Sequence, residues 1–155
     1  MFDLYEEFKS IVSALEEHGI DYALCGGLAM AVHGLPRATV DIDLLILGES
    51  LDEVREIART QGYTIEAFPM TFSHGAVDIR RVSKVDQETG IVLSLDMLLV
   101  TPEIVEIWQS RTEVAWESGN LWVVSRLGLM ALKSLRSSAQ DLADIEGLKE
   151  SEYES

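Results

Sequence analysis

Two apolar segments of the sequence each contain aspartate, and this combination limits how the chain can fold. The segment VDIDLLIL, residues 40–47, contains Asp41 and Asp43, and the segment IVLSLDMLLV, residues 91–100, contains Asp96. Both segments have the length and composition of buried β-strands. A lone buried carboxylate costs several kcal/mol of stability or becomes protonated. The fold must therefore provide these side chains with partners.

A divalent cation is one such partner. Side chains two positions apart in a strand point to the same face, so Asp41 and Asp43 should project together, about 7 Å apart, and repel each other. Mg²⁺ or Mn²⁺ shared with Asp96 would remove the conflict, because hard cations bind carboxylate oxygens. The alternative places Asp41 and Asp43 at an exposed strand end, solvated or paired with arginine, and makes Asp96 a protonated or hydrogen-bonded core residue.

Asp78, in the segment AVDIRRV, is a rival third ligand. Arg80 and Arg81 are its neighbours in the sequence, and they favour an ordinary ion pair at Asp78 instead.

A glycine pair precedes the acidic strand. Gly26 and Gly27 follow the strand-like segment YALC and open a short helix. Glycine allows a ligand to approach the backbone closely, and the N–H groups at a helix N-terminus can bind phosphate. An ordinary turn uses the same pair, so this feature alone is weak evidence.

The composition favours one cytoplasmic domain over residues 1–155. The chain has 27 acidic and 12 basic residues, a formal net charge of −15, and a single cysteine, Cys25. The acidity argues against a general nucleic-acid-binding protein, because such proteins need cations to replace the counterions on phosphates. A small anionic substrate or a basic protein partner is compatible with it. The acidic N-terminus does not resemble a signal peptide, and no apolar run has the length of a membrane span.

The hydrophobic periodicity predicts an α/β (α+β) fold with a mixed β-sheet flanked by helices. Ser50 and Glu53 form a capping-box pattern at the start of the third predicted helix. The core should span residues of about 20–100, and a C-terminal hairpin and helices should span about 101–149. Helices are predicted over 2–18, 26–34, 50–62, 101–108, 126–136 and 138–149, strands over 21–25, 40–47, 63–68, 76–85 and 91–100, and a hairpin over 112–125 with its turn at 118–120.

These motifs together resemble a known superfamily. A Gly-Gly pair after a strand, a spacer, DID and a later LDM resemble the nucleotidyltransferases related to DNA polymerase β. GGLAMAVHGLPRATVDIDLLI, together with LMALKSLRSSAQDLADIEGL, is similar to small prokaryotic nucleotidyltransferases akin to AbiEii-type abortive-infection toxins and minimal nucleotidyltransferases. The similarity extends over residues of about 20–149. It implies the nucleotidyltransferase fold, two-metal catalysis with Mg²⁺ or Mn²⁺, and a nucleoside triphosphate (NTP) as donor.

The resemblance also implies roles for individual residues. Gly26 and Gly27 would hold the triphosphate, Asp41 and Asp43 would bind both metals, and Asp96 would bind the catalytic metal. This arrangement is chemically coherent, because two metals can activate an acceptor hydroxyl and stabilise the pyrophosphate leaving group. Asp96 is then the group that binds, and can deprotonate, the attacking hydroxyl.

Two basic residues are candidates for phosphate contacts. Arg37 lies just ahead of the acidic strand, and Lys133 lies in the penultimate predicted helix. Either can instead be an ordinary surface charge. Asp141 and Asp144 match the terminal helix of the resembled family, and by chemistry alone they could equally be a helix cap and a structural partner of Lys133 or Arg136.

The leading functional hypothesis is a Mg²⁺-dependent, ATP- or NTP-binding nucleotidyltransferase that transfers a nucleoside monophosphate to an acceptor hydroxyl. A protein side chain or a small molecule suits the acidic chain better than an RNA end. A tRNA acceptor would require a basic face, for which the candidates are Arg80, Arg81, Lys84, Arg126 and Arg136.

The alternative is a catalytically quiet member that acts as a partner in a toxin–antitoxin-like system. Gly27 favours this alternative, because many active members have a serine there whose hydroxyl contacts phosphate. The three intact aspartates count against it.

Overall fold

A mixed β-sheet organises the chain, with strands in the order β3-β5-β6-β2-β1-β8-β7 and β4 also paired to β5, eight strands in all. The computed structural model describes residues 2–36, 38–117 and 119–154, without the side chains of residues 151–154. The strands are β1 (Ala23–Cys25), β2 (Asp41–Ile46), β3 (Ile65–Glu66), β4 (Met70–Phe72), β5 (Val77–Val85), β6 (Val92–Leu99), β7 (Thr112–Trp116) and β8 (Gly119–Val123). The helices are α1 (Leu4–Glu17), α2 (Gly26–Val32), α3 (Leu51–Thr60), α4 (Val105–Gln109), α5 (Arg126–Arg136) and α6 (Ala139–Glu154), with 3₁₀ turns at Gly48–Ser50 and Pro102–Ile104.

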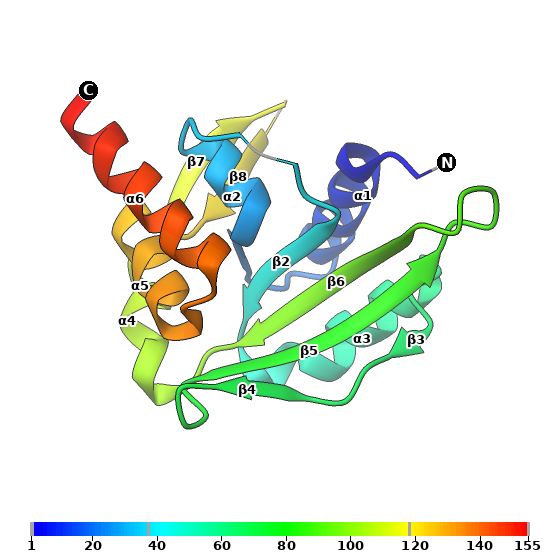
Figure 1. The fold of residues 1–155 in the computed structure, drawn as a ribbon. Coiled ribbons are helices and arrows are strands. Elements are labelled where there is room, and N and C mark those ends of the chain that lie inside the picture. The colour runs from blue at the N-terminus through cyan, green and yellow to red at the C-terminus, as the bar shows by residue number, and fades with distance from the viewer. Residues whose placement is uncertain (1, 37, 118, 155) are drawn as a thin grey trace.

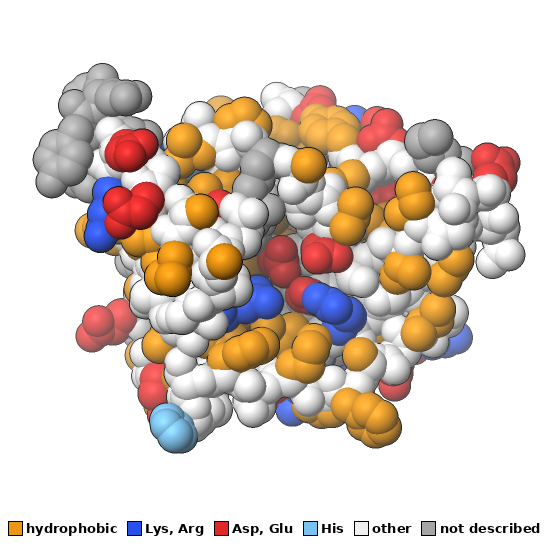
Figure 2. All heavy atoms as spheres, viewed as in Figure 1, with side chains coloured by type: hydrophobic (Ala, Val, Ile, Leu, Met, Phe, Trp, Pro, Cys, Tyr) orange, Lys and Arg blue, Asp and Glu red, His pale blue; other side chains and the backbone are white. Residues whose placement is uncertain are grey.

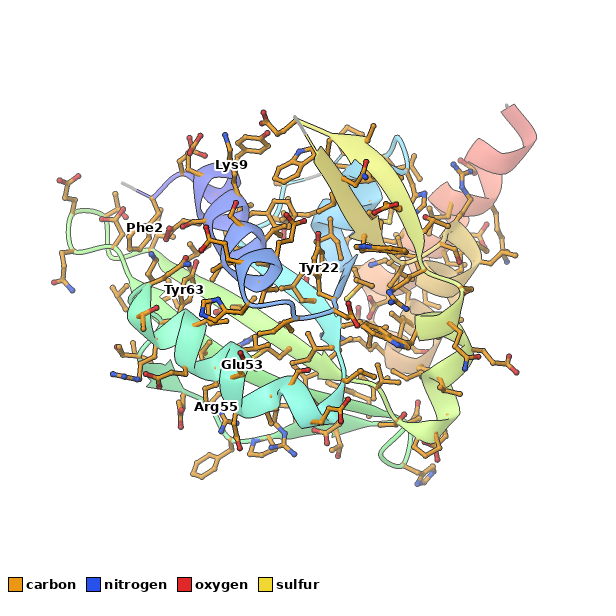
Figure 3. All side chains as sticks on the ribbon, turned by 180° about the vertical axis from the view of Figure 1, so that it is seen from behind. Phe2, Lys9, Tyr22, Glu53, Arg55 and Tyr63 are labelled. Atoms are coloured by element: carbon orange, nitrogen blue, oxygen red, sulfur yellow. The ribbon has the colours of Figure 1, made fainter. Side chains whose placement is uncertain are left out.

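The helices cover the two faces of the sheet unequally. Seen from behind, α1 and α3 lie across one face (Figure 3). On the opposite face, α2, α5 and α6 gather beside β1 and β8, while β2, β6 and β5 run past them without a helix in front of their centre (Figure 1). The central strands therefore have one face under helices and a second face, here called the open face, whose centre no helix crosses (Figure 1).

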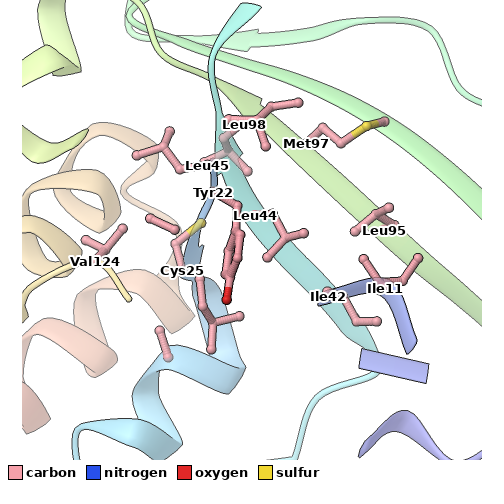
Figure 4. Packing of buried hydrophobic residues seen from close by; sticks show 14 of the residues in the cluster. Ile11, Tyr22, Cys25, Ile42, Leu44, Leu45, Leu95, Met97, Leu98 and Val124 are labelled. Carbon is pink, nitrogen blue, oxygen red and sulfur yellow. The ribbon is translucent and has the colours of Figure 1, made fainter. Parts of the chain in front are cut away.

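The core lies between the central strands and α1. Ile42 and Leu44 on β2 stand opposite Leu95 and Met97 on β6, and all four side chains are fully buried (Figure 4). Ile11 of α1 belongs to the same buried cluster. Since side chains alternate along a strand, the residues between these positions must point to the open face. The packing of Ile42 and Leu44 thus determines the direction of the aspartates beside them.

The structure confirms the predicted mixed-sheet α/β architecture. It also contains the predicted C-terminal hairpin, although Ser118, expected in its turn, lies outside the described residues. No helix among the described residues combines the length and the apolar character needed to span a bilayer.

Three local predictions were wrong. The strand expected over 63–68 is only β3, and β4 forms after Phe68 and Pro69, because proline has no N–H to donate to a sheet. The helix expected over 101–108 begins as a 3₁₀ turn and becomes α-helical only at Val105. The capping box at Ser50 is absent, because Ser50 has helical backbone angles that continue a 3₁₀ turn, whereas a capping serine is normally extended.

Candidate active site

The register between β2 and β6 places two aspartates side by side. The strands are parallel, with Asp43 opposite Asp96 and Asp41 opposite Ser94. Asp43 is 8% exposed and Asp96 only 2% exposed, whereas Asp41, at the start of β2, is half-buried. The three aspartates of the two apolar segments therefore converge on the open face of the sheet. Figure 2 shows acidic side chains gathered in a hollow of this face, with basic side chains next to them.

Arg81 is the partner of Asp96 in this structure. It stands opposite Asp96 in the antiparallel β5–β6 pair, and its guanidinium donates two hydrogen bonds to the carboxylate, from Nε to Oδ1 over 2.6 Å and from Nη2 to Oδ2 over 2.9 Å. The sequence pattern suggested Arg81 as a partner of Asp78 or as part of a basic face, but not as the partner of Asp96. Arg80 contacts Asp78 instead, at 3.0 Å. The β5–β6 turn contained the missing signal, since counting outward from it pairs Arg81 with Asp96.

Burial and a neighbouring carboxyl control the charge of Asp43. Burial, followed by the charge of Asp96 and a hydrogen bond with Asp96, together raise the pKa of Asp43 to about 8. Asp41 has a raised pKa for related reasons, burial first and Asp96 second, while Arg81 and Arg136 act in the opposite direction. Asp43 therefore keeps a proton at neutral pH, at the position where a cation would relieve the same repulsion.

The donor set at this site fits a hard divalent cation. Asp41, Asp43 and Asp96 offer carboxylate oxygens, which Mg²⁺ and Mn²⁺ prefer. In the described part of the chain, however, no three His, Cys, Asp or Glu side chains are already arranged to hold a metal ion. The physical reason is visible at Asp96, because both of its oxygens face Arg81. The metal-binding and catalytic roles of the three aspartates remain predictions.

Gly26 is pressed against Asp43. It has a φ of +68°, in the left-handed region, and a methyl group placed on it would lie 2.0 Å from Asp43 Oδ2. Gly27 has a different neighbour, because a methyl group there would lie 2.9 Å from Thr39 Cβ. Both glycines are thus required by the packing around the acidic strand. Their contact with a triphosphate remains a prediction.

Replacing Gly26 with alanine should lower the free energy of unfolding and disturb Asp43 at the same time. The left-handed backbone alone costs roughly 1–2 kcal/mol for alanine, and the collision with Asp43 should add about 1–3 kcal/mol of overpacking. Gly34→Ala is the matched control, since Gly34 has a φ of +88° with no atom within 4 Å of an added methyl group. Urea denaturation of wild type and both variants measures the free energy of unfolding that each substitution removes. Equal losses would show that Asp43 moves aside freely.

Lys133 is buried in an ionic cluster between α5 and α6. It is 5% exposed, and its Nζ lies 2.8 Å from Asp144 Oδ2 and 3.8 Å from Asp141 Oδ1. Asp141 also accepts hydrogen bonds from the backbone N–H and hydroxyl of Ser138, at 3.1 and 2.6 Å, and so caps the start of α6. Two carboxylates therefore face the Lys133 charge, and its predicted phosphate contact is untested. Arg37, the other candidate, lies outside the described residues.

A cavity among the described residues lies beside this site and does not include the aspartates. A pocket of about 300 Å³ lies beside α3 and is lined by Arg55, Phe68, Arg80 and neighbouring residues. Its three arginines already have acidic partners: Arg55 pairs with Asp52 and Glu66, Arg80 with Asp78, and Arg81 with Asp96. None of the three converging aspartates lines it. We therefore place the candidate site at the aspartates, where the chemical groups are, and not at this pocket.

Solved structures with a similar fold are nucleotidyltransferases. ANT(2″)-Ia in complex with adenylyl-2″-tobramycin is 15% identical, with a TM-score of 0.63, over 94% of this chain and 87% of that one. A putative nucleotidyltransferase (TM1012) from Thermotoga maritima is also 15% identical, with a TM-score of 0.58, over 97% and 93% of the two chains. At these identities the likeness establishes the fold alone. No curated protein matches the chain significantly.

A family model covers most of the chain and includes the acidic site. The model, described as the nucleotidyl transferase AbiEii toxin of a type IV toxin–antitoxin system, matches residues 11–114. This range contains the glycine pair, all three aspartates and Arg81, and it ends before α5 and α6. The protein is a member of the AbiEii nucleotidyltransferase family.

Proposed function

We propose that this protein transfers a nucleoside monophosphate from an NTP to an acceptor hydroxyl, with Mg²⁺ or Mn²⁺ bound by Asp41, Asp43 and Asp96. The observation that carries the proposal is the pair of buried carboxyls, Asp43 and Asp96, side by side on an open sheet face in a nucleotidyltransferase family. Such a pair is electrostatically unfavourable by itself. It becomes favourable when a cation replaces the proton of Asp43.

Bound divalent metal would supply positive charge for the triphosphate, the attacking hydroxyl and the pyrophosphate leaving group. Asp96 would bind the acceptor hydroxyl and accept its proton. Arg81 would orient Asp96 for this purpose, since its two hydrogen bonds fix the plane of the carboxylate. A carboxylate has about four lone-pair sites, so two hydrogen bonds leave room for further partners.

A protein side chain or a small molecule is the acceptor class that we favour. A tRNA acceptor would require a shared basic face, and the described basic residues do not form one. Arg81 points to the open face and binds Asp96, whereas Lys84 is on the helix-covered side, where it contacts Glu7 and the backbone oxygen of Gln61. The net charge of −15 also argues against an RNA acceptor, because it repels the phosphate backbone.

The catalytically quiet alternative loses one of its supports at Gly27. Gly27 packs closely against Thr39. This packing is a reason for glycine at the position, and the reason does not require that the protein has lost catalytic activity. The type IV toxin–antitoxin description of the family is compatible with an active toxin and leaves a protein partner as a prediction.

Incubation of the purified protein with each α-labelled NTP, with Mg²⁺ or Mn²⁺ and with or without cell extract, tests the proposal. We expect label to become attached to one acceptor class, with release of pyrophosphate, and to require metal. The double variant Asp41→Asn/Asp43→Asn should give no transfer. Label transfer that persists in this variant, or its absence from wild type with all four NTPs and extract, would contradict the proposed function.

A further inference from the structure

Arg136 is a cation beside the acidic site, and among the described residues it has no anionic partner. It is the last residue of α5, and its guanidinium lies over the Phe72 ring of β4, with 5.3 Å from the guanidinium carbon to the ring centroid. Its Nε is buried without a hydrogen-bond partner. Among the described residues, no hydrogen bond or ion pair involves the side chain of Arg136, although an unpaired buried donor is costly.

The charge of Arg136 acts on the acidic site. Burial raises the pKa values of Asp43 and Asp41, and Arg136 lowers both. Burial also raises the pKa of Cys25, at the end of β1, and Arg136 lowers that value too. The guanidinium is therefore within electrostatic reach of the carboxyls at the centre of the site, and it stacks on Phe72.

The other two cations near the aspartates are already engaged. Arg81 donates to both oxygens of Asp96, and Lys133 lies between Asp144 and Asp141. Arg136 is one helical turn beyond Lys133 on α5, so it belongs to the same side of the site. A hydrogen bond from Ser73 Oγ to the Leu135 backbone oxygen, 2.6 Å long, ties this end of α5 to the turn before β5. Arg136 is thus held in position with its donors unused.

We propose that Arg136 binds the polyphosphate of the nucleotide, taking the phosphate-binding role that sequence reasoning gave to Lys133. A guanidinium has a rigid fork of donors that matches two phosphate oxygens, and an aromatic ring beneath it limits its freedom before binding. This inference rests on the proposed function only for the identity of the nucleotide, since polyphosphate binding can be measured alone.

Titration with inorganic tripolyphosphate in the presence of Mn²⁺ tests the inference without an acceptor or a base. We expect Arg136→Met to weaken tripolyphosphate binding by about tenfold to a hundredfold, the loss of a charge-assisted hydrogen bond. Affinity for Mn²⁺ alone should be unchanged or higher, because a repelling cation has been removed. Arg136→Lys, which keeps the charge without the fork, should lie between wild type and Arg136→Met.

Arg59→Met is the matched control. Arg59 is an exposed arginine of α3, on the opposite side of the sheet, and pairs with Glu56. The Arg59→Met substitution changes the net charge by the same amount as Arg136→Met, and it should leave tripolyphosphate binding unchanged. A merely structural role for Arg136 predicts lower thermal stability with equal affinity per folded molecule.

Equal affinity of wild type and Arg136→Met for tripolyphosphate, including the case in which neither binds it, would overturn the inference. A wild-type protein that binds tripolyphosphate through Arg136 but transfers no nucleoside monophosphate would support the inference and contradict the proposed function. The two proposals can therefore fail separately.

Discussion

Replacing Asp43 with asparagine is expected to reduce nucleotidyl transfer by about a thousandfold or more, since the metal contributes several kcal/mol of transition-state stabilisation and each 1.36 kcal/mol is a factor of ten. The variant should also lose the thermal stabilisation that Mn²⁺ with ATP gives to wild type. That stabilisation amounts to about 2.7 kcal/mol at a hundredfold excess of ligand over its dissociation constant. Thermal melting of both proteins, with and without Mn²⁺ and ATP, measures this loss.

The same substitution should stabilise the metal-free protein at high pH. The pKa of Asp43 is raised from 3.8 to about 8 in the folded state, so between these values the folded protein holds a proton that the unfolded chain releases. The contribution of Asp43 to the free energy of unfolding is therefore highest at low pH, and it is lost as the pH rises from about 4 toward 8. Asparagine does not titrate. The variant should be close to wild type near pH 4 and more stable by a few kcal/mol above pH 8.

Asp78→Asn is the control for both effects. Asp78 lies at the start of β5 and pairs with Arg80, away from the converging aspartates. We expect normal transfer and a normal response to Mn²⁺ with ATP in this variant. If Asp43→Asn is instead less stable than wild type at pH 8 without metal, and wild type does not respond to metal, the acidic pair has a structural role and the metal site is refuted.

Replacing Lys133 with methionine should destabilise the protein by about 3–5 kcal/mol, because it leaves Asp144 and Asp141 as buried carboxylates without their cation. Lys133 Nζ is 2.8 Å from Asp144, in a cluster that joins α5 to α6. The double variant Lys133→Met/Asp144→Asn should regain part of this loss, since it also removes the carboxylate that lies nearest to the lost ammonium group. Urea denaturation at pH 7 gives the two values.

Lys149→Met provides the comparison on the surface of α6. Lys149 is exposed and lies 3.6 Å from Glu146, one turn earlier, and such exposed pairs contribute about 0–1 kcal/mol. A loss at Lys133 no larger than the loss at Lys149 would mean that the buried cluster contributes no more to stability than an exposed ion pair. An unstable Lys133→Met protein with normal tripolyphosphate affinity would also separate the structural role of Lys133 from the phosphate role proposed for Arg136.

The direction of the aspartates was readable from the sequence because it follows from local geometry. Asp41 and Asp43 alternate with Ile42 and Leu44, so burying the apolar residues under helices must turn both carboxyls to the other face. Asp96 alternates with apolar residues in the same way. The mixed sheet and its flanking helices were also predictable, since they rest on hydrophobic periodicity, which is a property of short segments.

Only the tertiary structure decided which charges meet. The partner of Asp96 depends on the β5–β6 register, which brings Arg81 and not Asp78 to it. The ion pairing of Lys133 depends on how α6 packs against α5. The position of Arg136 depends on Phe72 of β4, a strand that the sequence pattern did not predict. Pairing between distant segments is set by packing and register, and a single residue shift would exchange every partner. The sequence by itself therefore determined that carboxylates gather on one face of this sheet, and the tertiary structure determined which cations remain free to meet a substrate there.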